Sequence, residues 1–179
     1  MTIDDMLLAR AQAFCVAAHC AVGQKRKYTG EDYYHHPLEV AGILAKHAER
    51  LTNEMLAAAM LHDVVEDTAV TLEQVRHDFG DRVAELVEWV TDVSRPEDGN
   101  RATRKAKDRE HLAQAPAEAQ SIKLADMISN TSSILQHDPE FAKTYMREKQ
   151  ELLTVLTKGD RALYAMAEGI VGAYFGKHE

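Results

Sequence analysis

The sequence predicts an all-α protein. Apolar residues recur at helical spacing along nearly the whole chain, capping residues precede several of these segments, and no useful stretch alternates apolar and polar residues as a strand would. The 179 residues suit a single domain, which can bury a core without disulfides or structural metals. We therefore expect one bundle of about eight to ten helices.

The N-terminal part of the chain is expected to form four helices. The first carries an approximate apolar stripe made of Met6, Leu7, Ala13, Phe14, Ala17 and Ala18. Pro37 suits the first turn of a second helix, where its missing N–H costs little. Thr52 suits the N-cap of a third helix, and Thr71 with Gln74 forms a capping-box pattern for a short fourth one. The expected bounds are about 4–22, 37–47, 52–67 and 71–79.

The remaining chain is expected to form five more helices. Pro96 places a loop before a charged helix, and Pro116 ends that helix. Asp138 and Asp160 suit the N-caps of the last two helices, and Pro139 fits a first turn. The expected bounds are about 81–93, 101–114, 117–136, 138–158 and 160–175.

Composition excludes several classes of partner. The net charge of -8, from 21 basic and 29 acidic residues, argues against nucleic acid. Two cysteines, Cys15 and Cys20, are too few for a disulfide framework. The sequence shows neither a signal-peptide pattern nor an apolar run approaching the ~20 residues of a membrane span. We expect a protein of the reducing cytoplasm that binds no membrane. The sequence leaves open whether it forms a homodimer.

The pair His62-Asp63 marks the first candidate reaction centre. It interrupts an apolar helical run, where charge is costly unless it is paired or bound to metal. Glu66 and Asp67 follow His62 and Asp63 at a spacing of four, which places them on the same helix faces. A cation at His62 and Asp63 would leave the two later carboxylates beside a water or a phosphate, the layout for metal-assisted hydrolysis.

Two further residues are candidates for the same site. His36 precedes Pro37, where a helix start can fix it, and Asp126 interrupts another apolar helix. Asn130 lies four residues beyond Asp126 and shares its face. Each histidine taken alone would more often be a surface or hydrogen-bonded residue than a ligand, but the repeated acids in apolar helices favour a metal site.

At these residues the chain resembles the HD-domain metal-dependent phosphohydrolases. It is most similar to the hydrolase domain of the RelA/SpoT-type enzymes that degrade the alarmones guanosine tetra- and pentaphosphate. The most specific match is the run Leu-His-Asp-Val-Val-Glu-Asp-Thr. The matching stretches are 30–41, 61–68, 79–80 with 90–92, and 123–126 with Asn130.

The way the chain continues resembles a stand-alone small alarmone hydrolase. Only helical segments follow the helix of Asn130, and the stretch 104–126 is similar to stand-alone members in particular. We expect residues 1–179 to form a single HD-type domain, with a core at about 19–136 and C-terminal helices at 138–175 packed on it.

The resemblance implies a metal site and a reaction. It makes His36, His62, Asp63 and Asp126 the ligands of one divalent metal, usually Mn²⁺, and Glu66 with Asp67 the catalytic pair that orients or deprotonates water. The implied reaction removes the 3′-pyrophosphate of the alarmone and leaves GDP or GTP and pyrophosphate.

The resemblance also implies a nucleotide pocket. Arg26 and Lys27 match a basic pair that helps to hold the nucleotide, and arginine can stack on a base. Local positive charge for phosphates can come from the charged helix, although such residues can equally pair on a solvated face, as Arg104 could with Asp108. The expected substrate-binding residues are Arg26, Lys27, Tyr33, Asn130, Tyr145, Arg104 and Lys105.

Some positions depart from the family pattern. Met127 stands where a basic residue is usual, and Ser129 replaces a usual histidine or tyrosine. These departures leave open a related activity on another nucleotide, such as NADPH 2′-phosphate or an adenine alarmone. A non-catalytic nucleotide sensor is the other alternative, but the retained Glu66 and Asp67 argue against it.

Overall fold

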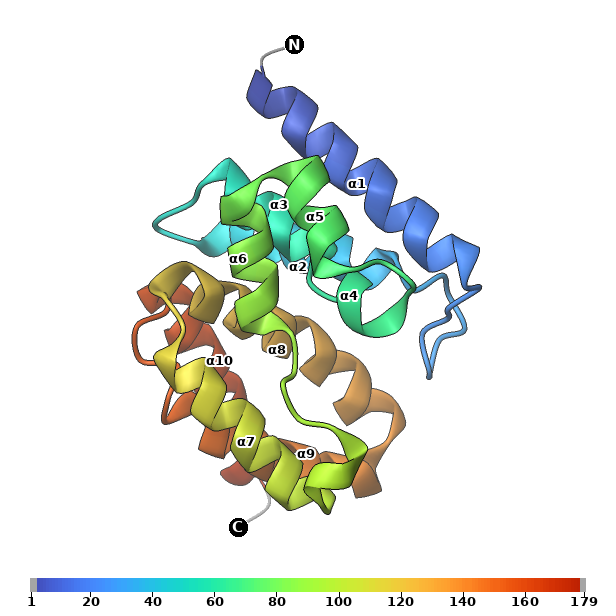
Figure 1. Ribbon diagram of the computed structural model, residues 1–179. Coiled ribbons are helices and arrows are strands. Elements are labelled where there is room, and N and C mark those ends of the chain that lie inside the picture. Colours follow the sequence, from blue (N-terminus) through green and yellow to red (C-terminus); the bar gives the residue numbers. More distant parts are fainter. Residues whose placement is uncertain (1–2, 178–179) are drawn as a thin grey trace.

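The computed structural model describes residues 3–177 and confirms the all-α prediction. Within this range there are ten α-helices and one short 3-10 helix, and the only extended pairing is an isolated bridge between Lys25 and Asp32 (Figure 1). The elements are α1 (Ile3–Ala21), α2 (His35–His47), α3 (Asn53–Leu61), α4 (Val64–Asp67), α5 (Leu72–Phe79), α6 (Asp81–Val90), η1 (Pro96–Asp98), α7 (Arg101–Gln114), α8 (Ala117–His137), α9 (Pro139–Leu153) and α10 (Arg161–Phe175). No helix of the described range combines the length and the apolar character that a membrane span requires.

The capping signals are confirmed at four helix starts. At each, a side-chain oxygen accepts a hydrogen bond from a backbone N–H of the first turn, which would otherwise lack a partner. The capping residues are Thr52, Thr71, Asp138 and Asp160. At Thr71 the reciprocal bond from its backbone N–H to the Gln74 side chain completes the capping box.

Two helices end earlier than the sequence predicts. Helix α6 stops at Val90 because Thr91 turns to an extended conformation, and the backbone N–H groups of Val93 and Ser94 bond to the buried carboxylate of Asp108 instead. Helix α9 stops at Leu153, and the following turn is held where the backbone N–H of Lys158 donates to the Gln120 side chain.

The single helix predicted over 52–67 is wrong, because the structure divides it at His62 and Asp63. Asp63 has φ −99° and ψ −5°, in the sparsely populated bridge region where many active-site residues lie. The backbone N–H of Asp67 still donates to the carbonyl of Asp63 at 2.9 Å. The break therefore re-aims the Asp63 side chain while keeping Glu66 and Asp67 one turn further on.

Helices α3 and α8 form the centre of the molecule. Helix α3 packs against α1, α2 and α6, whereas α8 packs against α2, α6, α9 and α10. In Figure 1, α8 runs between the group α1–α6 and the group α7, α9 and α10. The buried residues on these two helices include Met55, Ala57, Ala58, Ala59, Leu61, Ala119, Ile122, Leu124, Ala125 and Met127. The polar residues of the candidate site lie where α2, the end of α3 and α8 meet.

Candidate active site

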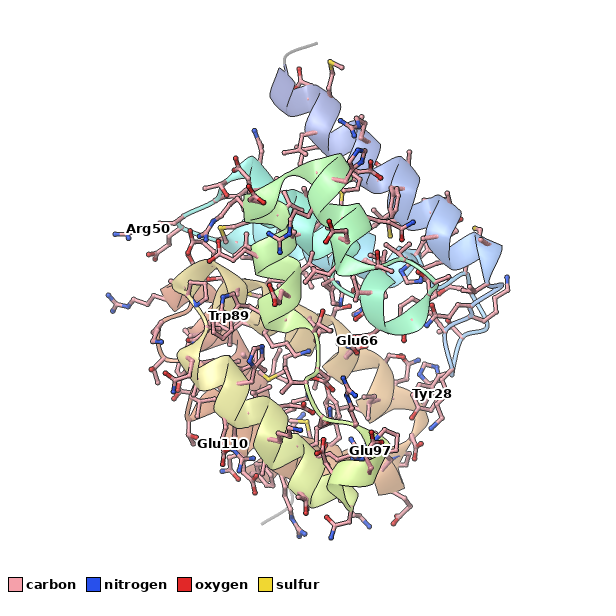
Figure 2. All side chains as sticks on the ribbon, viewed as in Figure 1. Tyr28, Arg50, Glu66, Trp89, Glu97 and Glu110 are labelled. Carbon is pink, nitrogen blue, oxygen red and sulfur yellow. The ribbon has the colours of Figure 1, made fainter. Side chains whose placement is uncertain are left out.

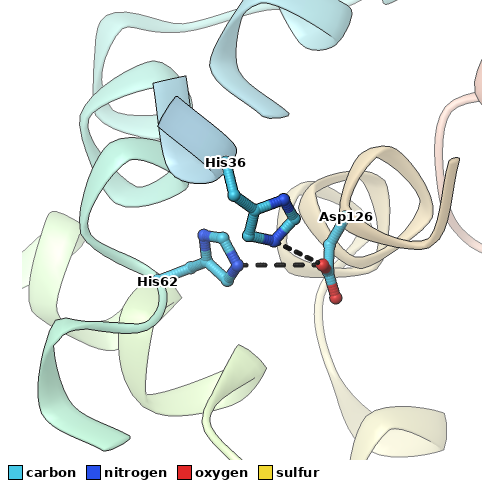
Figure 3. A group of neighbouring side chains, drawn as sticks. All are labelled: His36, His62 and Asp126. Atoms are coloured by element: carbon cyan, nitrogen blue, oxygen red, sulfur yellow. Dashed lines mark hydrogen bonds and ion pairs between the residues drawn. The ribbon is translucent and has the colours of Figure 1, made fainter. Parts of the chain in front are cut away.

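Four side chains converge at the junction of α2, α3 and α8. His36, His62 and Asp126 each place one ligand atom within 4.8 Å of the others, and Figure 3 shows the two rings facing the carboxylate. All three residues are buried. Oδ2 of Asp63 lies 3.0 Å from Nε2 of His62 and 3.8 Å from Nε2 of His36. The structure thus brings the four predicted metal ligands together.

The orientation of the His36 ring is set by a hydrogen bond on the side of the ring that faces away from Asp126. Its Nδ1 lies 2.9 Å from Oγ of Ser129, and this hydroxyl donates to Oε2 of Glu39 at 2.7 Å. A hydroxyl has one proton to give, so Ser129 must accept from the Nδ1–H of His36. In the neutral imidazole, Nε2 then presents a lone pair to Oδ1 of Asp126 at 3.1 Å. Two acceptors that face each other in this way fit a cation between them.

His62 presents its other nitrogen in the same manner. Nδ1 lies 2.8 Å from the carbonyl oxygen of Ala59, so it carries the proton. Nε2 is buried and makes no well-aligned hydrogen bond in residues 3–177, although Oδ2 of Asp63 lies 3.0 Å away as an ion-pair partner. Burial opposes a charge on this ring, but the carboxylate of Asp63 outweighs burial and raises the pKa of His62 to about 9. The negative charge of Asp63 favours a proton on Nε2, and a bound divalent cation would take the place of that proton.

Both carboxylates are held as anions by neighbouring donors. Burial opposes their ionisation, but His62 lowers the pKa of Asp63, and Lys123, with Nζ 3.1 Å from Oδ2, lowers that of Asp126 well below its usual range. The hydroxyl of Tyr33 donates to Asp63 at 2.7 Å, and the amide of Asn130 donates to Asp126 at 2.6 Å. Two imidazoles and two carboxylates form a donor set that suits a divalent transition metal.

Glu66 faces the loop after α6. Its Oε1 accepts from the backbone N–H of Asp92 at 2.6 Å, and Figure 2 shows the side chain leaving α4 toward that loop. Partial desolvation raises the pKa of Glu66 to about 7; Lys123 opposes this shift and the charge of Asp92 adds to it. A carboxyl with a pKa near neutrality is suited to accept a proton in a reaction.

Asp67 faces the opposite side, toward α1. Its Oδ2 accepts a hydrogen bond from Nε2 of Gln24 at 2.9 Å. Desolvation raises the pKa of Asp67, and the Gln24 hydrogen bond works against that rise. The two acidic residues that the sequence placed together therefore flank the centre from two sides.

A cavity of about 360 Å³ lies beside Glu66. It is lined by Glu66, Asp92, Ser94, Arg101, Arg104 and Lys105. Two of the three basic residues that line it are already paired with carboxylates. Lys105 pairs with Asp92 at 2.6 Å, and Arg101 pairs through two nitrogens with Glu148. Nε of Arg104 is buried without a hydrogen-bond partner in the described residues. The alternative pairing of Arg104 with Asp108 is not formed; Asp108 binds Lys105 and the loop backbone.

A second cavity, of about 150 Å³, contains most of the predicted nucleoside pocket. Its lining includes Arg26, Lys27, Tyr33 and Asn130. The guanidinium of Arg26 donates to Oδ1 of Asn130 at 3.1 Å and lies 5.9 Å from the centre of the Tyr33 ring. Lys27 is largely exposed and reaches the hydroxyl of Tyr28 at 3.1 Å. Tyr28 stacks on His137, with ring centres 5.8 Å apart, and so ties this loop to the end of α8.

Three residues that the sequence linked to substrate recognition lie elsewhere. Tyr145 is buried with its hydroxyl 3.5 Å from Thr131, and it lines neither of these two cavities. Met127 is a core residue. Ser129 contacts the far side of His36 instead of a nucleotide pocket. The departures at Met127 and Ser129 therefore do not bear on the walls of these cavities.

Sequence reasoning missed several polar residues that support the site. His19 is buried and bonds to Gln24, and Glu39 reaches Ser129. Lys123 was expected only as a source of local positive charge, and it pairs with Asp126. The buried face of α1 is Ala11, Cys15 and His19, whereas Met6 of the predicted stripe is 46% exposed. The spacing of four along this face was the available signal for His19, but the contacts of Gln24 and Glu39 depend on the tertiary fold.

Comparisons with known proteins show the family of the chain. The family described as "HD domain" matches residues 11–159. The "Probable guanosine-3′,5′-bis(diphosphate) 3′-pyrophosphohydrolase" of Synechocystis is 34% identical over 158 residues, which cover 87% of this chain and 20% of the relative. The chain thus spans about a fifth of the length of that relative.

Two further relatives match over nearly their whole length. The "Guanosine-3′,5′-bis(diphosphate) 3′-pyrophosphohydrolase MESH1" of Xenopus tropicalis is 32% identical, covering 94% of this chain and 93% of the relative. A solved structure described as "A metazoan ortholog of SpoT hydrolyzes ppGpp and plays a role in starvation responses" superposes with a TM-score of 0.84 at 27% identity, covering 94% of this chain and 95% of that one. Given these matches and the convergence of His36, His62, Asp63 and Asp126, the chain belongs to the HD domain family.

Proposed function

We propose that this protein hydrolyses the 3′-pyrophosphate of guanosine tetra- and pentaphosphate in a metal-dependent reaction, leaving GDP or GTP and pyrophosphate. The observation that carries the proposal is the pair of imidazole Nε2 atoms aimed at the carboxylates of Asp63 and Asp126, with Glu66 and Asp67 on either side. The relatives named for this activity support the choice of substrate.

We propose that His36, His62, Asp63 and Asp126 hold one divalent metal, Mn²⁺. The buried Nε2 of His62, which faces Oδ2 of Asp63, and the acceptor-to-acceptor contact between His36 and Asp126 support a cation at this point. Mn²⁺ accepts such a mixed set of nitrogen and oxygen ligands. When bound, the metal would supply positive charge that activates water and stabilises the charge of the reacting phosphate.

Glu66 and Asp67 would accept a proton from the attacking water and orient it. Water attacks the phosphorus nearest the ribose 3′-oxygen, a new P–O bond forms, and the bond from phosphorus to the 3′-oxygen breaks. Glu66, whose pKa of about 7 leaves it about half ionised at neutral pH and ionised above it, would accept the proton that the water loses. Asp67 would orient the same water, and the released 3′-oxygen takes up a proton.

The two cavities suggest how a nucleotide lies across the site. Arg104, which lines the cavity beside Glu66 and whose buried Nε has no hydrogen-bond partner in the described residues, would bind phosphate oxygens through its guanidinium. Lys105 would contribute charge while paired to Asp92. Arg26, held by Asn130 and near Tyr33, would offer its guanidinium plane to the base. Lys27 is placed to approach the nucleotide from the exposed rim.

The decisive experiment measures turnover of a defined substrate. Purified protein is incubated with Mn²⁺ and guanosine tetraphosphate, and GDP and pyrophosphate are quantified against the His62→Ala variant. No product above that variant contradicts the proposal. NADPH and adenine alarmones belong in the same panel, and turnover of one of these in place of the guanosine nucleotide would redirect the substrate assignment.

We further infer that the protein works in the reducing cytoplasm. Both cysteines are free thiols, with Cys15 buried and Cys20 exposed, and this state suits a reducing compartment. Fractionation of cells that express the chain at native level would test the location.

A further inference from the structure

A chain of hydrogen bonds links a buried histidine to Asp67. Nδ1 of His19, on the last turn of α1, lies 2.7 Å from Oε1 of Gln24, and Nε2 of Gln24 lies 2.9 Å from Oδ2 of Asp67. His19 is completely buried, although it takes no part in the reaction described above. Its burial beside an acidic residue of the site calls for a role.

The end of α1 brings His19 and Gln24 together. The N–H of Gly23 donates to the carbonyl of Cys20, and the N–H of Gln24 donates to the carbonyl of His19. This pair of bonds is the Schellman motif that ends many helices, and it uses the positive φ of Gly23, +63°. The N–H of Tyr33 donates to the Gln24 carbonyl, so the backbone of Gln24 is fixed on both sides.

The chemistry of the groups fixes the direction of each hydrogen bond. An ionised carboxylate only accepts, so the Gln24 NH₂ must face Asp67 and the Gln24 carbonyl must face His19. That carbonyl can bond only to a proton on Nδ1 of His19. A reversed amide would place its oxygen 2.9 Å from Oδ2 of Asp67, where both atoms are acceptors. His19 and Asp67 together therefore permit one orientation of the Gln24 amide.

We propose that His19 and Gln24 are positioning residues, which hold the Asp67 carboxylate in the orientation that its work on the attacking water requires. Asp67 is otherwise an exposed side chain at the end of the one-turn helix α4, and its Oδ1 makes no hydrogen bond within residues 3–177. Fixing Oδ2 leaves Oδ1 as the oxygen available to the water. This inference rests on the role proposed above for Asp67.

Positioning requires a rigid anchor, and His19 supplies one. The His19 ring lies on the buried face of α1, and its centre is 5.0 Å from the centre of the Tyr33 ring. The hydroxyl of Tyr33 donates to Asp63. Asp63 and Asp67 are thus each braced from the α1–α2 region, through Tyr33 and Gln24 respectively. A misplaced reacting group costs rate more than it costs substrate binding.

The test is a double-mutant cycle between Gln24 and Asp67. Gln24→Ala, and Gln24→Glu with the same shape but no amide donor, should each lower kcat on guanosine tetraphosphate about tenfold, while KM and the affinity for Mn²⁺ stay within about twofold. In an Asp67→Asn background, Gln24→Ala should cost less than about twofold more, because the group it positions is already lost. An equal loss in both backgrounds, or unchanged kcat in Gln24→Ala, overturns the proposal.

His19 gives a matched pair of variants. His19→Asn keeps a donor near the position of Nδ1 and should stay within about threefold of the wild-type kcat, whereas His19→Phe fills the space without a donor and should lose about tenfold. Gln12→Ala, on the exposed side of α1, controls for changes in that helix. Melting temperatures identify any variant that fails to fold.

A spectroscopic readout separates this inference from the proposed function. If the wild-type protein turns over no guanosine tetraphosphate, the proposed function fails. The side-chain amide signals of Gln24 in ¹H–¹⁵N spectra would still report the hydrogen bonds. They should shift in both Asp67→Asn and His19→Phe and stay unchanged in Gln12→Ala; no shift in either of the first two variants overturns the inference.

Discussion

The hydroxyl of Ser129 lies 2.9 Å from Nδ1 of His36. Because this hydroxyl donates its hydrogen bond to Glu39, it must accept the hydrogen bond from Nδ1–H of His36. The opposite nitrogen of His36 is thereby left as a lone pair directed at the metal site. A position that departs from the family pattern thus supports a proposed metal ligand, and the first prediction follows from it.

Ser129→Ala should weaken Mn²⁺ binding about tenfold, because partners behind a ligating histidine fix its tautomer and ring orientation. Ser129→Thr keeps the hydroxyl and should recover most of the affinity. Ser132→Ala is the matched control, since this hydroxyl bonds only to the Ser129 carbonyl on the same helix. Titration calorimetry of the metal measures the effect without substrate, and equal affinities for all three variants would exclude a role for Ser129.

The reaction rate should follow the ionisation of Glu66. The pKa of Glu66 is raised to about 7, so this carboxyl is protonated and cannot accept a proton at lower pH. We expect kcat to rise with pH through about 7 and then level, and Glu66→Gln to lower kcat about a hundredfold and abolish that rise. The measurement is the pH–rate profile of both proteins at saturating Mn²⁺. A rise near pH 7 that persists in Glu66→Gln would assign it to another group.

Arg104 should matter for substrate binding. Arg104 lines the cavity, and its buried Nε has no partner in the described residues, so truncation would remove the proposed phosphate contact and break no ion pair seen in the structure. Arg104→Ala should raise KM about tenfold with a smaller effect on kcat, as expected for one charge-assisted contact. Lys107→Ala serves as control, because Lys107 lies on the same helix as Arg104 but is already paired with Asp98. Equal KM values in the two variants would contradict the assignment.

Asp160 should contribute more to stability than an ordinary capping residue. One oxygen caps α10 at the N–H groups of Ala162 and Leu163, and the other accepts from the N–H of Glu49 at 2.7 Å. Asp160→Ala should therefore lower the free energy of unfolding by about 2 kcal/mol, against about 1 kcal/mol for Thr71→Ala, whose side chain caps only its own helix. Urea denaturation compares the two. A smaller loss in Asp160→Ala than in Thr71→Ala would show that the bond to Glu49 adds nothing.

Helix positions and polar candidates could be predicted from the sequence because they depend on neighbours within a turn. Thr52 and Thr71 cap their helices as expected. His62, Asp63 and Asp126 could be recognised as polar residues in apolar helical segments, and His36 by its place before Pro37 at a helix start. Regular spacing could not show that the helix predicted over 52–67 divides at Asp63. At that break Asp63 contacts Tyr33 in the loop before α2, His36 on α2 and its neighbour His62, and contacts so far apart in the sequence cannot be read from spacing.

The sequence by itself determined the all-α class, because helix periodicity is a local rule, and it singled out candidate residues for a metal site, because buried charge is costly. The tertiary structure decided which partner each residue received. Glu66 meets the loop after α6 and Asp67 meets Gln24, because α4 lies between these two regions. Tyr145 and Met127 became buried residues for a similar reason, since the packing of α8 against α9 and its other neighbours turns them away from the two cavities.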